Sequence, residues 1–126
     1  MVPRRRTRYG YGNIQSMDGK DPEPEIIRPG GGSRRRRQEP ADVSVVIVTY
    51  NSAKVIGECL RSLYDGSCGL RKEVFVVDNA SSDNSVALVQ SQFPDVIIIA
   101  NQENRWFAAA NNQAILRSRG RYILQL

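Results

Sequence analysis

The sequence contains no histidine and only two cysteines among its 126 residues. Without histidine, the chain has no Ser–His or Cys–His catalytic pair and no imidazole to bind a metal. Cys59 and Cys68 are too few for a disulfide scaffold or for a zinc site built from four thiolates. These absences exclude hydrolases that depend on a histidine base, disulfide-rich secreted domains and zinc modules.

Long apolar runs are also missing. Runs such as Val45–Val48 and Val96–Ala100 are only four and five residues long, whereas a helix needs about 20 apolar residues to cross a membrane. The arginine-rich start is not followed by an apolar segment, so it does not fit a secretory signal. We therefore expect a cytoplasmic protein, and its basic start adds the alternative of a peripheral position at the inner face of the membrane.

Charge is distributed unevenly along the chain. Residues 1–40 carry 10 basic and 5 acidic side chains, whereas residues 41–126 carry 8 of each and are neutral overall. Five of the six prolines also lie in the first segment, which has too few apolar residues to offset the entropy lost on folding. We predict that residues 1–40 are a disordered basic tail. Its clusters Arg4–Arg6 and Arg34–Arg37 fit either a solvated tail or weak contact with anionic lipid, while nucleic acid is not expected as a partner.

Residues 41–126 contain continuous apolar runs that are typical of strands buried on both faces of a sheet. The predicted strands are Val43–Val48, Val74–Val77, Val96–Ala100 and Tyr122–Leu126. After each of the first three strands, apolar residues recur at helical spacing. Strands that alternate with helices predict the α/β class, with an open parallel sheet and right-handed crossovers.

The expected helix ends follow from capping residues and glycine. We expect Asn51 or Ser52 to cap the start of the first helix, and Ser81 or Ser82 to cap the start of the second. The apolar face of the first helix is expected to include Val55. A third helix is expected over about 107–119, with Gly120 just after its end. In parallel sheets, ligands bind at the carboxyl ends of the strands. This rule selects three polar stretches, Thr49–Ser52, Asp78–Asp83 and Asn101–Ala109.

The first of these stretches contains no glycine, which excludes the glycine-rich turns that hold dinucleotides or the phosphates of nucleoside triphosphates. Tyr50 and its small polar neighbours suit a nucleobase, held by stacking and hydrogen bonds, although a strand often ends on an aromatic residue. In the second stretch, the Asp78 carboxylate could accept an N–H of a base or cap the local turn. Asp83 suits the positive end of the following helix.

The third stretch combines amides with alanines at a helix start, where a phosphate is favoured. Asn111 and Asn112 fit this role, or they are polar residues on a helix surface. Taken in order, VSVVIVTYN (43–51), VVDNASSD (76–83) and NRWFAAANN (104–112) resemble the family 2 glycosyltransferases. The likeness is greatest to bacterial rhamnosyltransferase-type members, which build cell-wall and surface polysaccharides.

This resemblance implies a GT-A fold, of which residues 41–126 would be the amino-terminal, nucleotide-binding half. It also implies binding of a nucleoside-diphosphate sugar, with dTDP-rhamnose or a UDP-sugar as candidates, and inverting transfer of a hexosyl group. The residues that match the family's nucleotide-sugar site are Thr49, Tyr50, Asn51, Asp78, Asn79, Ser81, Asp83, Asn104, Phe107 and Asn111. Among them, Asp78 would contact the base.

Two departures from the family pattern stand out. Trp106 occupies a position where the family has glycine, which permits unusual backbone angles or close approach. The family's Asp-x-Asp-type metal motif would follow Tyr122–Leu126, and its catalytic base and acceptor-binding half come later still. The Mg²⁺ or Mn²⁺ expected for a complete domain therefore has no ligands in this chain. We assign no catalytic or metal residue.

The leading hypothesis is thus a glycosyltransferase that moves a sugar to a polysaccharide or glycolipid, present as a half that is inactive alone. Its carbohydrate or lipid-linked acceptor would be bound by the missing half. The alternative is a non-catalytic nucleotide-binding or interaction module with a basic tail. A third hypothesis, a protein that holds nucleic acid or membrane through its tail, predicts that deleting residues 1–40 abolishes such binding.

Overall fold

A sheet with strand order β1-β4-β3-β2-β5 lies at the centre of the computed structural model, which describes residues 22–30, 40–67 and 69–126. The strands are β1 (Glu25–Ile27), β2 (Val43–Thr49), β3 (Lys72–Asp78), β4 (Ile97–Ala100) and β5 (Tyr122–Gln125). The helices are α1 (Ile56–Gly66), α2 (Ser85–Gln92) and α3 (Trp106–Ile115). The expected α/β class, with strands and helices in alternation, is confirmed.

Strands β2 to β5 are parallel, as the sequence predicts. β2 pairs with β3 on one side and with β5 on the other, and β3 pairs with β4. The strand order therefore reverses beside β2. Such a reversal is where open α/β sheets bind ligands at the carboxyl ends of their strands.

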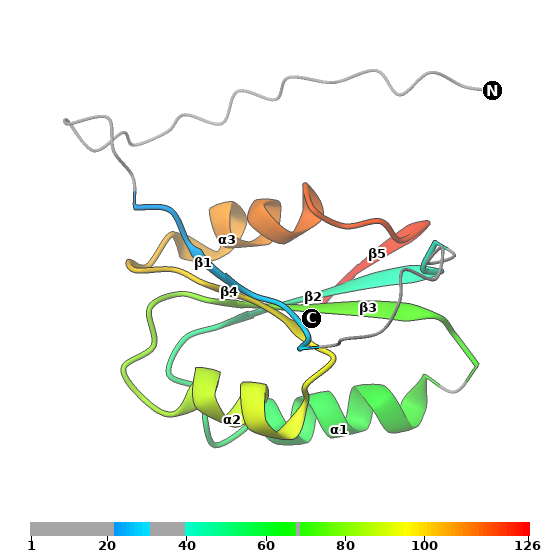
Figure 1. The fold of residues 1–126 in the computed structure, drawn as a ribbon, viewed down its shortest axis with the longest axis horizontal. Helices are drawn as coiled ribbons and strands as arrows, with labels where there is room; N and C mark the ends of the chain where they lie inside the picture. Colours follow the sequence, from blue (N-terminus) through cyan, green and yellow to red (C-terminus); the bar gives the residue numbers. More distant parts are fainter. Residues whose placement is uncertain (1–21, 31–39, 68) are drawn as a thin grey trace.

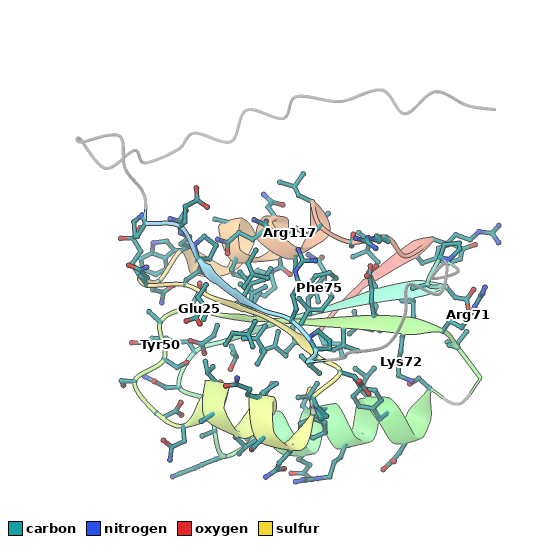
Figure 2. The ribbon with its side chains drawn as sticks, in the orientation of Figure 1. Glu25, Tyr50, Arg71, Lys72, Phe75 and Arg117 are labelled. Atoms are coloured by element: carbon teal, nitrogen blue, oxygen red, sulfur yellow. The ribbon has the colours of Figure 1, made fainter. Side chains whose placement is uncertain are left out.

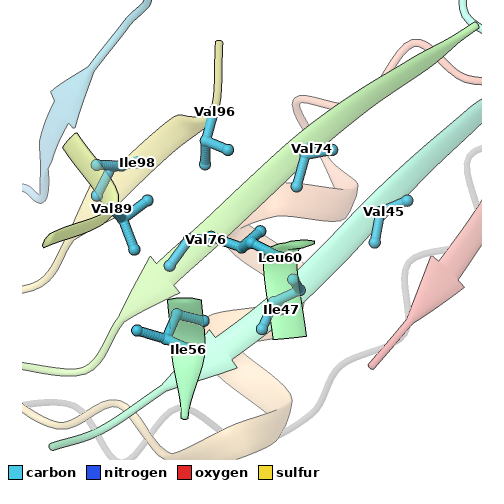
Figure 3. Packing of buried hydrophobic residues seen from close by; sticks show 9 residues of the cluster. All are labelled: Val45, Ile47, Ile56, Leu60, Val74, Val76, Val89, Val96 and Ile98. Carbon is cyan, nitrogen blue, oxygen red and sulfur yellow. The ribbon is translucent and has the colours of Figure 1, made fainter. Parts of the chain in front are cut away.

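Helices cover both faces of the sheet, α1 and α2 on one and α3 on the other (Figure 1). Because successive strand residues point to opposite faces, Val45 and Ile47 join the core under α1 and α2, while Val46 joins the core under α3. Figure 3 shows the first of these cores around Leu60. On the other face, the small Ala110 and Ala114 let α3 pack closely on β2 and β3.

Strand β1 corrects the prediction of a disordered tail for residues 22–30. It runs antiparallel to β4, with Glu25 opposite Ala100 and Ile27 opposite Ile98 (Figure 1). Without it, β4 would present an open edge, which is costly for a sheet. The rest of the tail, with both arginine clusters, lies outside the described residues.

Helix α3 ends at Ile115, earlier than the sequence predicts, and Gly120 does not cap it. Gly120 instead lies against β2, where a Cβ atom would come within 2.4 Å of the backbone nitrogen of Ser44. Its N–H donates to Ser44 Oγ at 2.8 Å. Glycine is thus needed for the close approach of two chain segments, which local sequence does not reveal.

The first two helices also begin later than predicted, at Ile56 and Ser85. Val55 is exposed rather than part of the apolar face. The expected caps at Asn51, Ser52, Ser81 and Ser82 are wrong, because these residues bond instead to the neighbouring loops or turns. Among the residues placed by the structure, no helix is long and apolar enough to span a membrane.

Candidate functional site

Three strands end side by side at one edge of the sheet. Thr49 of β2 is in register with Asp78 of β3, and Asp78 is in register with Ala100 of β4. The three loops that follow these strands therefore begin next to one another. Figure 2 shows Tyr50 at this edge, at the opposite end of the sheet from Arg71 and Lys72. These loops contain the polar stretches that the sequence selects.

The loops after β2 and β3 are joined through Asn51. Its backbone N–H donates to Ser81 Oγ at 2.8 Å, and its Oδ1 accepts from the backbone N–H of Ser82 at 2.8 Å. Asn51 adopts a φ of 48°, in the left-handed region that asparagine tolerates better than most residues. This asparagine therefore fixes the relative position of the two loops.

Ser52 and Asp83 add further bonds between the same loops. The Ser52 N–H donates to the buried Ser85 Oγ at 2.9 Å, and the Ala53 N–H donates to Asp83 Oδ2 at 3.0 Å. Asp83 Oδ1 accepts from the hydroxyl and the backbone N–H of Ser85. The Ser85 hydroxyl bond, followed by the Ala53 N–H bond, holds the pKa of Asp83 below 3.8. As expected from the sequence, Asp83 lies at the start of the second helix.

Asp78 is buried, with 2% of its surface exposed. Its Oδ2 accepts from the Ser81 N–H at 2.9 Å and its Oδ1 from the Ser81 hydroxyl at 2.5 Å. Asp78 thus caps the local turn, which includes Ala80 at a φ of 62°. Each carboxylate oxygen can accept a second hydrogen bond, so the turn role and contact with a base are compatible.

Asn79 links β3 to the loop after β4. Its Oδ1 accepts from Asn101 Nδ2 at 3.1 Å and from the Arg105 N–H at 3.3 Å, while its Nδ2 lies 3.4 Å from the Trp106 carbonyl oxygen. Asn101 in turn exchanges two hydrogen bonds with Gln113 of α3, at 2.9 and 2.8 Å. The sequence analysis did not single out Asn101, Arg105 or Gln113. Asn101 and Arg105 lie in the selected stretch Asn101–Ala109 but received no role there, and Gln113 lies outside that stretch.

The start of α3 exposes two aromatic rings. Asn104 Oδ1 accepts from the Trp106 N–H at 2.8 Å, and Trp106 has a φ of 60°. Both Trp106 and Phe107 are exposed, while Asn111 is buried and donates to the Phe107 carbonyl at 2.8 Å. Trp106 therefore occupies a backbone conformation that glycine would adopt without strain.

Two buried oxygens at this edge have no hydrogen-bond partner among the described residues, Thr49 Oγ1 and Asn111 Oδ1. Such atoms are rare in folded proteins because burial removes their bonds to water. The ten predicted site residues thus all lie on the strand ends, on the three loops or on the first turns of α3. Burial divides them, since Tyr50 and Phe107 are exposed and Thr49, Asp78, Asn79 and Asn111 are buried.

The acidic residues of this edge do not fit a divalent cation. Asp78 and Asp83 are bound to serine and backbone donors, whereas Mg²⁺ and related ions prefer several free oxygen ligands. Within the described ranges, no group of three or more His, Cys, Asp or Glu side chains could hold a metal ion.

Comparison with known proteins assigns the family. The model for glycosyl transferase family 2 matches residues 44–126, which include the whole site. The chain belongs to glycosyl transferase family 2. The resemblance drawn from the three motifs is thereby confirmed at the level of the family.

Two curated relatives of this family 2 member illustrate the extent of the match. The uncharacterized glycosyltransferase YfnE of Bacillus subtilis is 38% identical over 80 residues, which are 61% of this chain and 20% of YfnE. The succinoglycan biosynthesis protein ExoO of Rhizobium meliloti is 40% identical over 86 residues, which are 68% of this chain and 24% of ExoO. The chain spans about a fifth to a quarter of the length of these relatives.

Two solved structures are similar as well. The mannosyltransferase PcManGT of Pyrobaculum calidifontis, in complex with GDP-Man and Mn²⁺, matches with a TM-score of 0.54 and 32% identity, over 64% of this chain and 25% of that one. TarS of S. aureus matches with a TM-score of 0.59 and 28% identity, over 68% of this chain and 26% of that one. The expected GT-A fold is confirmed for this family 2 chain.

Proposed function

We propose that residues 41–126 bind a nucleoside-diphosphate sugar at the shared end of β2, β3 and β4, as the donor-binding part of a glycosyltransferase. The observation that carries this proposal is the register of Thr49, Asp78 and Ala100, which gathers three polar loops at the carboxyl ends of neighbouring parallel strands, with β2 at the point where strand order reverses. The complex of PcManGT with GDP-Man supports a donor of this chemical class.

Each loop has a distinct part in the proposed site. Thr49, Tyr50 and Asn51 form the nucleoside side of the pocket, and the remaining acceptor capacity of Asp78 takes an N–H of the base. Asn79, Ser81 and Asp83 hold the loops in place through the bonds described above. Asn104, Phe107 and Asn111 lie toward the diphosphate and the sugar, where the amino-terminal end of α3 favours negative charge.

Transfer itself needs more than this segment supplies. A base must remove a proton from the acceptor hydroxyl, and the developing charge on the diphosphate must be stabilised, which a divalent cation can do. The similar PcManGT is in complex with Mn²⁺. Because the acidic residues of the site do not fit such an ion, we assign it no ligand here. We propose that the chain binds the donor but does not transfer the sugar by itself.

The family resemblance further favours dTDP-rhamnose or a UDP-sugar as the donor, and inversion at the transferred carbon. A polysaccharide or glycolipid acceptor is supported by relatives such as ExoO, which is named for succinoglycan biosynthesis, and the poly(ribitol-phosphate) beta-glucosyltransferase of Bacillus spizizenii, 33% identical over 87 residues. We propose a cytoplasmic position at the membrane, with weak contact between residues 1–40 and anionic lipid.

Isothermal calorimetry on the full chain tests the donor site. UDP, dTDP and GDP, and their sugar-linked forms, are titrated separately. We expect saturable binding of one stoichiometric equivalent for at least one nucleotide, retained after deletion of residues 1–20. Absence of saturable binding for all of them would contradict the proposal and favour an interaction module.

A further inference from the structure

Trp106 occupies a strained backbone position at the edge where the three loops meet. Its φ of 60° lies in the left-handed region, which residues other than glycine, asparagine and aspartate seldom adopt. The conformation is held by hydrogen bonds on both sides of the residue, to Asn104 Oδ1 and from Asn79 Nδ2. Trp106 therefore cannot relax without loosening the loop.

Packing does not compensate for this strain, because 77% of the Trp106 surface is exposed. Trp106 therefore lowers the stability of the fold in two ways. Its backbone conformation is strained, and its apolar ring is left in contact with water. Strained residues of this kind persist at ligand sites, where their position serves binding rather than folding. The cost at Trp106 thus indicates a contact made outside the folded chain.

The place of Trp106 in the sheet indicates which part of a ligand it would meet. Asp78 lies at the end of β3, between β2, which leads into the exposed Tyr50, and β4, which leads toward Trp106. Strands two positions apart in a sheet are about 9–10 Å apart. A flat ring in contact with an aromatic ring on each side needs about 7–8 Å, so the strand spacing leaves room for a base over the end of β3, between the loop after β2 and the loop after β4.

A second, independent observation also points to a ligand here. Thr49 Oγ1 and Asn111 Oδ1 are buried without a hydrogen-bond partner in the part of the chain that the structure describes. Only 3% of each residue is exposed. Thr49 directly precedes Tyr50, and Asn111 bonds to the carbonyl of Phe107, next to Trp106. Polar atoms without a partner among the described residues thus lie at the end of β2 and in α3, in the two segments that carry Tyr50 and Trp106.

We propose that Trp106 is a wall of the nucleobase pocket, stacking its indole on one face of the base while Tyr50 contacts the other. The edge of the base then faces Asp78. This inference rests on the proposed function, and it adds a binding role for a residue at which the chain departs from the family's glycine. Base–aromatic stacking is strong enough to decide affinity.

Intrinsic fluorescence tests the contact directly, because Trp106 is the only tryptophan in the chain. UDP, dTDP and GDP are titrated while emission and quenching by acrylamide are recorded, with pyrophosphate and free rhamnose as separate arms. We expect a nucleoside diphosphate to change the emission and to lower acrylamide quenching by about twofold, as the indole becomes covered. Unchanged quenching at a nucleotide concentration that calorimetry shows to be saturating overturns the proposal, as does the same change with pyrophosphate or rhamnose alone.

Substitutions separate a binding role from a structural one. Trp106→Gly should raise the melting temperature, because it removes the strain, and should weaken nucleotide binding about tenfold. Trp106→Phe should retain most of the affinity, and Leu116→Ala, at an exposed apolar residue just after α3, should leave it unchanged. If Trp106→Gly binds the nucleotide with unaltered affinity, the proposed role of Trp106 is wrong and the donor site is unaffected. Failure of the unsubstituted chain to bind any nucleotide overturns the donor site and, with it, the role of Trp106.

Discussion

Asp83 joins two loops that start from different strands, since its Oδ2 accepts from the Ala53 N–H at 3.0 Å while its Oδ1 accepts from Ser85. The Ser85 hydroxyl, first among these donors, lowers the pKa of Asp83 from 3.8. A carboxyl with a lower pKa in the folded state adds stability above its unfolded pKa. That stability is lost as the pH falls through the folded pKa.

Asp83→Asn should therefore reduce the loss of stability that occurs as the pH falls. We expect the melting temperature of the unsubstituted chain to fall as pH drops below roughly 4, and the variant to show a shallower fall over the same range. Thermal unfolding followed by circular dichroism between pH 7 and pH 2 measures both. Asp95→Asn, at an exposed residue away from these loops, is the control. An identical loss of stability in Asp83→Asn and the unsubstituted chain would show that the bridge contributes nothing.

Asp78→Ala should weaken nucleotide binding about tenfold, because a carboxylate that accepts an N–H of the base is lost. Asp95→Ala should have no effect. Since Asp78 also holds the turn through Ser81, Ser81→Ala is measured in parallel by calorimetry and thermal unfolding. Equal affinities of Asp78→Ala and Asp95→Ala contradict a contact with the base, and an equal loss in Ser81→Ala assigns the effect to the turn.

Gly120→Ala should destabilise the fold by about 1–3 kcal/mol, because the new methyl group would lie 2.4 Å from the backbone nitrogen of Ser44. Gly66→Ala is a matched control, since a Cβ at Gly66 meets nothing within 4 Å. Urea unfolding gives the free energies of both variants. Equal stability of the two variants would argue against a tight contact between Gly120 and β2.

Leu60→Ala should cost about 2–5 kcal/mol of unfolding free energy, because Leu60 is fully buried between α1 and the sheet. Leu116→Ala removes the same atoms from a residue that is 83% exposed and should change stability little. Chemical unfolding of both variants checks the prediction. A small effect at Leu60 would place the core elsewhere than in Figure 3.

Removal of residues 1–40 should lower the melting temperature and promote aggregation, because it deletes β1 and opens the edge of β4. Removal of residues 1–20 leaves β1 intact and serves as the control. Light scattering and thermal unfolding of both deletions check the prediction. A sharp, reversible transition of residues 41–126 as a monomer would contradict it.

The parallel strands could be predicted because their apolar runs differ from everything around them. Val43–Val48 and Val74–Val77 lie within β2 and β3 as the structure has them. The candidate site followed from the same pattern, since polar residues at the ends of parallel strands necessarily meet at one edge. Both inferences depend only on patterns within a short stretch of the chain.

Other features depend on partners distant in the sequence and leave no local signal. Glu25–Ile27 is a strand only because β4 offers it an edge. Asn51 and Ser52 have the chemistry of helix caps, yet their backbone N–H groups bond to Ser81 and Ser85 in the next loop. At Trp106 the sequence showed only that a tryptophan replaces a glycine of the family pattern. It did not show the strained backbone angle.

The pairing of β1 with β4 gives the chain a particular order of assembly. During synthesis, Glu25 leaves the ribosome long before Ala100, the residue opposite it in the sheet. The carbonyl oxygens of Pro22 and Glu23 accept hydrogen bonds from Arg105 and Gln102, which are also synthesised later. β1, the first strand of the described residues, can therefore dock only after β4 and the third loop of the site have been made.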